Sequence, residues 1–146
     1  MKHPITEIEK DVYVLDVQVG YLMRLANQRH SSLFQDTMPF NLTATQFAAL
    51  VKLHENGTCS QNELGRQTAM DVATIKGVVE RLNKKGLMTI KADPNDKRRS
   101  LLSLPQAALD IIDELQDAGR AVTGLTLSPL NASEQKTLLR LLRKLA

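Results

Sequence analysis

The sequence has one cysteine, no long apolar run and only three histidines, and each scarcity excludes a class of protein or site. A single cysteine, Cys59, excludes an intrachain disulfide and fits a reducing cytoplasm. No apolar stretch approaches the roughly 18 residues of a membrane-spanning helix, so we expect no membrane association. The three histidines, His3, His30 and His54, lack the spacing of metal ligands, so we expect no metal and no other cofactor.

Catalytic motifs are also missing from the sequence. It has no Ser-His-Asp or Cys-His arrangement, no glycine-rich phosphate loop and no HExxH pattern. The carboxylates that cluster at residues 110–117 fall on the polar face of an expected helix, where charges are normally solvated. We therefore expect that the protein is not an enzyme.

Positive charge is concentrated in one quarter of the chain. Residues 71–103 carry eight basic and four acidic side chains, a balance of +4, whereas the other residues have a balance of −1. Such a segment indicates a polyanion partner, and a solvated surface is the alternative interpretation. The chain has 146 residues, of which 42% are apolar, enough for one domain with a real core.

Apolar spacing and capping residues predict a mainly helical chain. Residues 7–36 show the three- and four-residue steps of one long helix, which Pro39 terminates. Capping boxes at 43–46 and 60–63 predict two shorter helices, the first ending at Gly57.

A further helix is predicted between Asp71, its N-cap, and Gly86. Its expected buried residues are Val72, Ile75, Val79 and Leu82.

The next segment predicts a β-hairpin and two more helices. Residues 87–91 and 100–104 are strand candidates around turn residues 93–96, with Lys97, Arg98 and Arg99 as a basic tip. Pro105 suits the first turn of a helix. Its expected apolar stripe is Ala108, Ile111, Ile112, Leu115 and Ala118. Ser128 or Asn131 can cap a last, leucine-rich helix.

A short helix, a turn, a second helix and a basic hairpin together predict a winged helix-turn-helix. A helix fits the major groove of DNA, and a two-stranded ribbon beside it reaches the minor groove. We expect Arg98 to enter the minor groove, with Asp96 holding an arginine in position. The predicted DNA-binding residues are Ser60, Gln61, Thr68, Ala73, Thr74, Lys76, Gly77, Arg81, Asp96, Lys97, Arg98 and Arg99.

Three stretches, LTATQF at 42–47, VVERLNKKGL at 78–87 and DPNDKR at 93–98, carry a resemblance to a known family. On these residues the sequence resembles the multiple antibiotic resistance regulator (MarR) family of winged-helix transcription factors. The resemblance implies a homodimer built from the first and last two helices, a palindromic double-stranded DNA operator, and a minor-groove arginine within a D-x-R motif. That motif falls here on Asp96 and Arg98.

The expected fold is therefore mainly α with a small β-hairpin, a winged helix-turn-helix flanked by N- and C-terminal dimerisation helices. Residues 1–146 would form a single MarR-type domain. Its DNA-binding lobe would span about 42–104, and its helical dimerisation region about 5–36 and 105–146. The leucines of the last helix independently favour a dimer, because an exposed apolar stripe is a liability. An intramolecular core helix is the alternative.

The resemblance also implies an effector, a small phenol or aromatic carboxylate that binds between the dimer helices and the winged domain. Four of the five aromatic residues lie between positions 21 and 47, and Arg24 or His30 can pair with a carboxylate. The candidate effector residues are Tyr21, Arg24, His30, Phe34, Phe40 and Phe47. The alternative interpretation places Phe34 and Phe47 in helix cores.

These observations predict a cytoplasmic, sequence-specific transcriptional regulator, a homodimeric repressor released from its operator by a small aromatic ligand. One alternative is a winged-helix protein-interaction module that does not bind DNA. Another is a regulator that senses oxidants through a cysteine. Such sensors carry the cysteine near the start of the first long helix, whereas Cys59 directly precedes the helix-turn-helix, so a small buried residue is the favoured interpretation.

Overall fold

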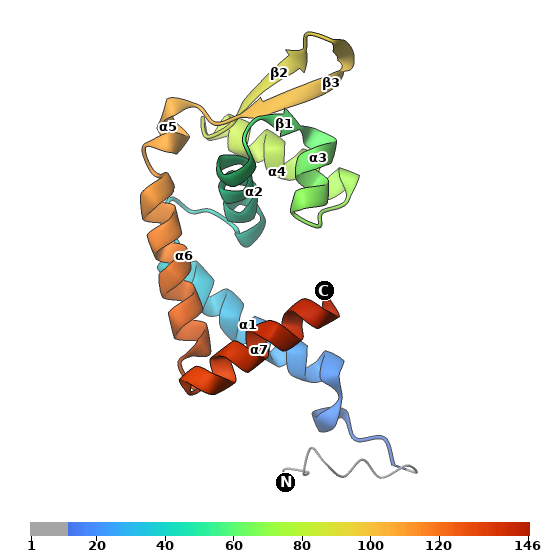
Figure 1. Ribbon diagram of the computed structural model, residues 1–146, viewed down its shortest axis with the longest axis vertical. Helices are drawn as coiled ribbons and strands as arrows, with labels where there is room; N and C mark the ends of the chain where they lie inside the picture. Colours follow the sequence, from blue (N-terminus) through green and yellow to red (C-terminus); the bar gives the residue numbers. More distant parts are fainter. Residues whose placement is uncertain (1–11) are drawn as a thin grey trace. The chain divides into compact units, whose positions relative to one another are not determined.

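The computed structural model describes residues 12–146, which are mainly helical with a small three-stranded antiparallel sheet (Figure 1). The predicted fold class is confirmed. The chain divides into two compact units, which we call the winged unit, Thr37–Ala121, and the terminal unit, made of residues 12–36 and 122–146.

The winged unit contains three helices packed around a shared core, followed by the sheet. The helices are α2 (Ala44–Asn56), α3 (Gln61–Gln67) and α4 (Val72–Lys84). After the sheet come α5 (Gln106–Leu109) and the first part of α6 (Ile112–Leu127). The side chains with almost no solvent exposure include Leu50, Leu64, Ile75, Val79, Leu82, Met88, Leu102 and Leu115. Each buried side chain of this size contributes about 1.5–3 kcal/mol of hydrophobic free energy, so this unit has a complete core of its own.

Local capping interactions begin α2 and α4 at the predicted positions. Thr43 and Gln46 form a capping box, in which each side chain accepts a hydrogen bond from the other residue's backbone N–H, both at 3.2 Å. The Asp71 carboxylate accepts a bond from the Thr74 backbone N–H at 2.7 Å. Gly57 ends α2 with φ +82°, a conformation that costs glycine little.

The second predicted capping box forms only in part. Ser60 Oγ accepts a hydrogen bond from the Glu63 backbone N–H at 3.2 Å, so Ser60 is the N-cap of α3. The Glu63 carboxylate instead accepts bonds from Arg66 and Gln67, because these side chains lie one turn further along α3.

The buried side of α4 differs from the prediction at its first residue. Val72 is 70% exposed, whereas Val78 is only 3% exposed. A helical repeat of 3.6 residues places Ile75, Val78, Val79 and Leu82 on one face and turns Val72 away from it.

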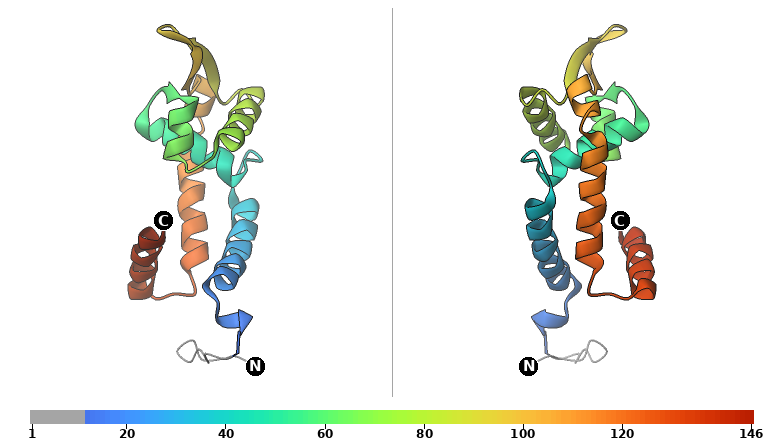
Figure 2. Two further views of the ribbon diagram at one scale, coloured as in Figure 1. Left: turned by 90° about the vertical axis from the view of Figure 1, so that its right-hand side faces the viewer. Right: turned by 90° about the vertical axis from the view of Figure 1, so that its left-hand side faces the viewer.

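The sheet has the order β1-β3-β2, with β1 (Cys59–Ser60), β2 (Thr89–Asp93) and β3 (Asp96–Ser103). The pair β2–β3 is the predicted hairpin and extends beyond the helices of its unit (Figure 2). The basic residues 97–99 lie in β3 rather than at the tip, because β3 begins at Asp96, where the turn closes. The sequence did not predict β1, since two residues are too few for a periodic pattern.

The helix predicted after Pro105 is divided into α5 and α6. Pro105 is the N-cap of α5 rather than part of its first turn, and residues 110–111 separate the two helices. Of the predicted stripe, Ala108, Ile112 and Leu115 are buried, and the other two residues are partly exposed.

In the terminal unit, the first predicted helix begins later than expected. Leu15–Val17 forms a single 3-10 turn, Gln18 is extended, and α1 (Val19–Thr37) follows. The β-branched valines in this stretch disfavour a continuous helix because their side chains crowd the preceding turn. Residues 7–11 of the predicted helix lie outside the described residues.

Hydrogen bonds connect α1 to the C-terminal end of α6. The Arg29 guanidinium donates to the carbonyls of Thr126 at 2.8 Å and Leu125 at 2.9 Å. His30 Nδ1 lies 2.9 Å from the Thr126 hydroxyl. Because these carbonyls lack partners inside the helix, a cation there stabilises the end of α6. The last helix, α7 (Ala132–Leu145), begins with a capping box between Asn131 and Glu134, and none of its residues is buried.

The turn before α2 contains two consecutive residues in the left-handed backbone region, Phe40 (φ +63°) and Asn41 (φ +53°). Asparagine tolerates this region, but for a bulky residue such as Phe40 it is strained by about 1–3 kcal/mol. The Lys85 ammonium donates a hydrogen bond to the Asn41 carbonyl at 2.8 Å. This long-range bond holds the turn in its strained form.

Candidate nucleic-acid interface

Helix α4 presents most of the residues predicted to contact bases on its solvent face. Ile75 and its buried neighbours anchor the opposite face in the core. Ala73, Thr74 and Lys76 are exposed in the first turns, directly after the Asp71 cap. The hydrogen bond from the Thr74 backbone holds the pKa of Asp71 below its usual value, because it stabilises the carboxylate. The cap therefore fixes the end of the helix whose side chains would enter the major groove.

A glycine on α4 makes room for an arginine side chain. A Cβ placed on Gly77 would lie 3.2 Å from Nη1 of Arg81, one turn further along the helix. The Arg81 guanidinium thus lies back over Gly77, near the residues of the first turns. Within residues 12–146, no carboxylate oxygen lies within 4.0 Å of the charged nitrogens of Lys76 or Arg81. Both cations are therefore free to bind an external anion.

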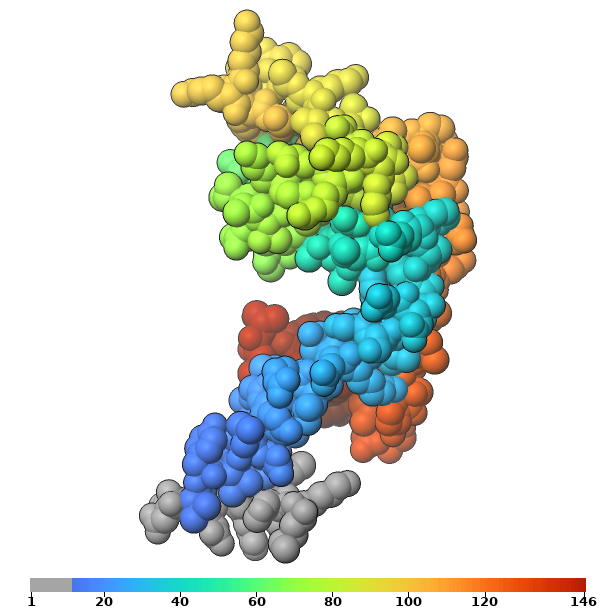
Figure 3. Space-filling view, turned by 180° about the vertical axis from the view of Figure 1, so that it is seen from behind, coloured from blue at the N-terminus to red at the C-terminus, as the bar shows by residue number. Residues whose placement is uncertain are grey.

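The wing arginine is held by the carboxylate predicted for it. Asp96 Oδ1 accepts hydrogen bonds from the Arg98 backbone N–H at 3.0 Å and from Arg98 Nε at 3.3 Å. The Arg98 side chain nevertheless remains 92% exposed. In the space-filling view, hairpin side chains project from the winged unit into open space (Figure 3). This geometry suits a guanidinium that enters a narrow DNA groove, because Asp96 already orients the arginine side chain through its Nε.

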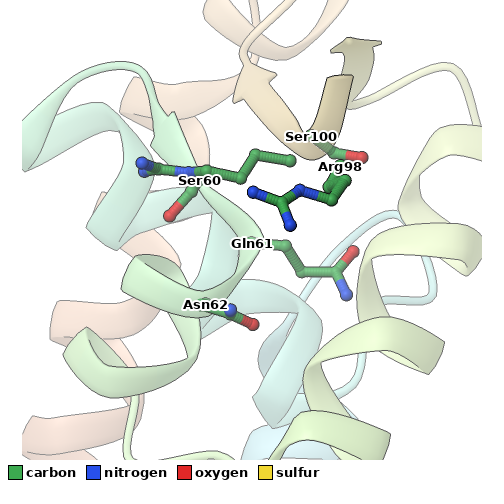
Figure 4. A pocket seen from close by; sticks show the side chains of 6 residues that line it. Ser60, Gln61, Asn62, Arg98 and Ser100 are labelled. Carbon is green, nitrogen blue, oxygen red and sulfur yellow. The ribbon is translucent and has the colours of Figure 1, made fainter. Parts of the chain in front are cut away.

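A polar hollow of about 130 Å³ lies between the start of α3 and β3 (Figure 4). Its lining residues are Ser60, Gln61, Asn62, Arg98, Arg99 and Ser100. Nε of each arginine faces a carboxylate outside the lining, Asp96 at 3.3 Å from Arg98 and Asp93 at 4.0 Å from Arg99. The remaining N–H groups of the two guanidinium groups can donate hydrogen bonds to an oxyanion such as a DNA phosphate. The structure thus brings together four residues predicted separately from the sequence.

Sequence reasoning missed Asn62 and Ser100 in this hollow. Asn62 directly follows Gln61, so its place in the first turn of α3 was an available signal. Ser100 was assigned to a strand, and only the pairing of β1 with β3, with Ser60 opposite Leu101, brings that strand beside α3.

Thr68 has a structural bond that disfavours the predicted phosphate contact. Its hydroxyl donates a hydrogen bond to the Leu64 carbonyl at 2.7 Å, within the end of α3. Only acceptor lone pairs then remain on the oxygen, and a phosphate offers no proton to them.

The candidate effector residues are divided between the two units. Tyr21 and Arg24 lie together on α1, with the guanidinium carbon 5.5 Å from the ring centroid, a cation–π distance. Phe34 is buried among the core residues of the described chain. The Phe47 ring packs so closely on α6 that a Cβ at Gly119 would lie 2.8 Å from it. The surroundings of Phe34 and Phe47 are those that the alternative interpretation, a place in helix cores, expects.

His30 and Phe40 have different surroundings. His30 is bonded to Thr126 within the terminal unit, as described above. Phe40 is 46% exposed at the strained turn of the winged unit.

Cys59 lies half-buried in β1. Burial raises the pKa of its thiol, and the negative charge of Glu63 raises it further. A raised pKa reduces the thiolate fraction near neutral pH, and the thiolate is the form that reacts with oxidants. This environment disfavours a redox-sensing role.

Residues 12–146 provide neither a metal site nor a membrane-spanning helix. Within that range no three His, Cys, Asp or Glu side chains gather in a way that could hold a metal ion. No helix in the same range combines the length and apolar character needed to cross a membrane.

Known proteins match this chain over the segments that form the helix-turn-helix and the hairpin. A model of the MarR family matches residues 42–100. The HTH-type transcriptional repressor NicR of Pseudomonas putida is 37% identical over 94% of this chain and 88% of its own length. A probable transcriptional regulator from Pseudomonas aeruginosa has a TM-score of 0.88 and 50% identity, covering 91% of this chain and 100% of that one.

A second solved structure concerns BpsR of Bordetella bronchiseptica and the regulation of its DNA binding by 6-hydroxynicotinic acid. It has a TM-score of 0.86 and 38% identity, covering 92% of this chain and 96% of that one. These similarities extend over almost the whole chain, including both flanking helical segments. The protein therefore belongs to the MarR family of DNA-binding transcriptional regulators, as its three sequence stretches predicted.

Proposed function

We propose that this transcriptional repressor acts as a homodimer on a palindromic operator and leaves it when a small aromatic acid binds. The observation that carries DNA recognition is the exposure, on one compact unit, of both the polar face of α4 and the Asp96-oriented Arg98. In this proposal α4 reads the major groove and Arg98 enters the adjacent minor groove. Arg99 and the polar side chains at the start of α3, which line the rest of the polar hollow, bind a backbone phosphate.

The apolar surface of the terminal unit supports a homodimer. Its large apolar side chains with substantial exposure include Val12, Tyr13, Leu15, Val19, Leu22, Met23, Leu25, Leu125, Leu139, Leu141, Leu142 and Leu145. A monomer with this surface in contact with water would tend to aggregate, whereas an identical partner can cover it. A two-fold dimer then presents two copies of α4 to sites about 34 Å apart, one turn of DNA, which explains why we propose a palindrome.

Two relatives support an aromatic acid as the effector. DNA binding by BpsR, 38% identical, is regulated by 6-hydroxynicotinic acid, an aromatic ring with a carboxylate. NicR, 37% identical, is a repressor. We propose the same ligand class here, with Tyr21, Arg24 and His30 as candidate contacts in the terminal unit and Phe40 in the winged unit. A hundredfold weakening of operator binding requires about 2.7 kcal/mol of differential ligand affinity.

The test is fluorescence anisotropy with duplexes from the DNA that flanks the gene. We expect saturable binding to a palindromic sequence, competition by the same duplex but not by a scrambled one, and a steep loss of affinity as salt rises. Adding 6-hydroxynicotinic acid should release the operator, and its neutral amide should not. Equal affinity for palindromic and scrambled duplexes would contradict sequence-specific recognition, and the absence of binding to either duplex at any salt concentration would favour the interaction-module alternative.

A further inference from the structure

Val72, the first residue of α4, is an apolar side chain that the fold of the winged unit leaves in solvent. It is 70% exposed, against 46% or less for every other large apolar side chain of that unit. Valine is a poorer helix former than alanine, and an exposed position gains little from burial. Neither helix formation nor core packing therefore accounts for an apolar residue at this place.

Val72 lies at the end of α4 that would face the bases. It directly follows the Asp71 cap, whose carboxylate accepts a bond from the Thr74 backbone N–H at 2.7 Å and so fixes the first turn. Ala73 and Lys76 are exposed beside it. Residues four apart on a helix have Cβ atoms about 5–6 Å from each other, so Val72 and Lys76 share one side of α4. Because the N-terminal residues of a recognition helix contact base edges, Val72 belongs to the same surface as the predicted base contacts.

The major groove of DNA offers an apolar group to such a side chain only at thymine. Thymine carries a C5-methyl group, whereas the other base edges present hydrogen-bond donors and acceptors. The isopropyl group of valine can neither donate nor accept, so against a polar edge it would displace water without replacing the lost hydrogen bond. Against the thymine methyl, two apolar surfaces leave water together. A valine at this place therefore favours thymine over cytosine.

We propose that Val72 is a specificity-determining residue that contacts the C5-methyl group of one thymine in each operator half-site. The proposal rests on the proposed function, which puts α4 in the major groove, and adds an apolar base contact to the polar ones. Burying one methyl group is worth about fourfold in affinity for each half-site. Since a palindrome contains the contact twice, the two methyl groups together contribute about 10- to 20-fold.

Fluorescence anisotropy with the palindromic duplex tests the contact, with thymines replaced by deoxyuridine one symmetric pair at a time. Deoxyuridine pairs with adenine as thymine does and lacks only the C5-methyl group. At one pair or more, the replacement should weaken wild-type binding about 10- to 20-fold. Val72→Ala should bind the unmodified duplex more weakly by a similar factor, and replacing that same pair should then cost little further affinity.

Two controls separate methyl recognition from general damage. Leu109→Ala removes an exposed apolar side chain of α5 in the same unit, and should keep the full deoxyuridine effect. Because Val72 is exposed, Val72→Ala should keep the thermal midpoint of the wild type. With cytosine at the sensitive pair the wild type should bind weakly, and 5-methylcytosine should recover part of the affinity because it restores the methyl group.

The outcomes distinguish this contact from the proposed function. If no thymine pair is sensitive in the wild type, or if Val72→Ala keeps the full sensitivity at every pair, the thymine contact of Val72 is overturned. The proposed function still stands in that case when the wild type prefers the palindrome to a scrambled duplex. If the wild type does not distinguish those two duplexes, the proposed function fails and the thymine contact fails with it.

Discussion

The winged unit and the terminal unit differ in how they cover their apolar side chains. In the winged unit, helices α2, α3 and α4 and the sheet enclose leucine, isoleucine and valine side chains almost completely. In the terminal unit, no residue of α7 is buried, and large apolar side chains of α1 also remain exposed. The first unit can stabilise its fold from its own residues, whereas the second needs another surface. The difference supports our proposal that base reading and assembly belong to different parts of this chain.

The largest effect is expected from charged substitutions on the exposed apolar surface of the terminal unit. The double variant Leu141→Glu, Leu142→Glu places two carboxylates on the surface proposed for the partner, and burying unpaired charge costs several kcal/mol. We expect a monomer by size-exclusion chromatography with light scattering, and operator affinity at least about a hundredfold weaker because one α4 then binds alone.

Lys136→Glu on the same helix is the control, because it adds a carboxylate at an exposed polar position. It should remain a dimer. If the double leucine variant stays dimeric, α7 is not part of the dimer interface.

A smaller effect is expected at the wing. Arg98→Ala removes the oriented guanidinium and should weaken operator binding about ten- to a hundredfold, which corresponds to about 1.4–2.7 kcal/mol summed over the two half-sites. Since Arg98 is almost fully exposed, the thermal midpoint and the dimer should not change. Arg120→Ala removes another exposed arginine, on α6, and should bind the operator normally. Equal affinities of the two variants would exclude the wing role.

A still smaller effect on operator affinity is expected from a substitution at Gly77 on α4. Gly77→Ala should stabilise the helix by about 0.5–1 kcal/mol, yet weaken operator binding a few-fold by displacing the Arg81 guanidinium. In an Arg81→Ala background the same change should cost no further affinity. An equal loss in both backgrounds would show instead that Gly77 allows close approach of the helix backbone to the bases.

The smallest effect concerns the cap of α4. Because the pKa of Asp71 is lowered in the folded protein, the stability it contributes is present above its unfolded pKa, near 3.9, and is lost as pH falls through the folded value. Asp71→Ala should therefore lower the thermal midpoint at neutral pH. Its difference from the wild type should shrink below about pH 4. A constant difference down to pH 2 would contradict an ionised cap.

The sequence predicted features that depend on neighbouring residues and missed those that depend on distant ones. Thr43 with Gln46, and Asp71 with Thr74, interact over three residues, so the caps of α2 and α4 were readable. Val72 was misassigned because its apolar character outweighed its position at the first turn. The Asp96–Arg98 pair was likewise local and was predicted.

The missed features need long-range contacts. The bond from Lys85 to Asn41 spans 44 positions, and the pairing of β1 with β3 joins Cys59 to Leu102. No local pattern encodes either contact. The same limit applies to the polar hollow, whose residues come from two segments that only the sheet brings together.

We infer that two winged units, joined through their terminal units, bind one face of a single duplex. The most direct measurement compares the native palindrome with a duplex carrying about five additional base pairs between its half-sites, which rotates them by half a turn. We expect two chains to bind the native duplex, and the affinity for the lengthened duplex to fall to that of a single half-site. Equal affinity for both duplexes, or one chain on the native palindrome, would contradict it.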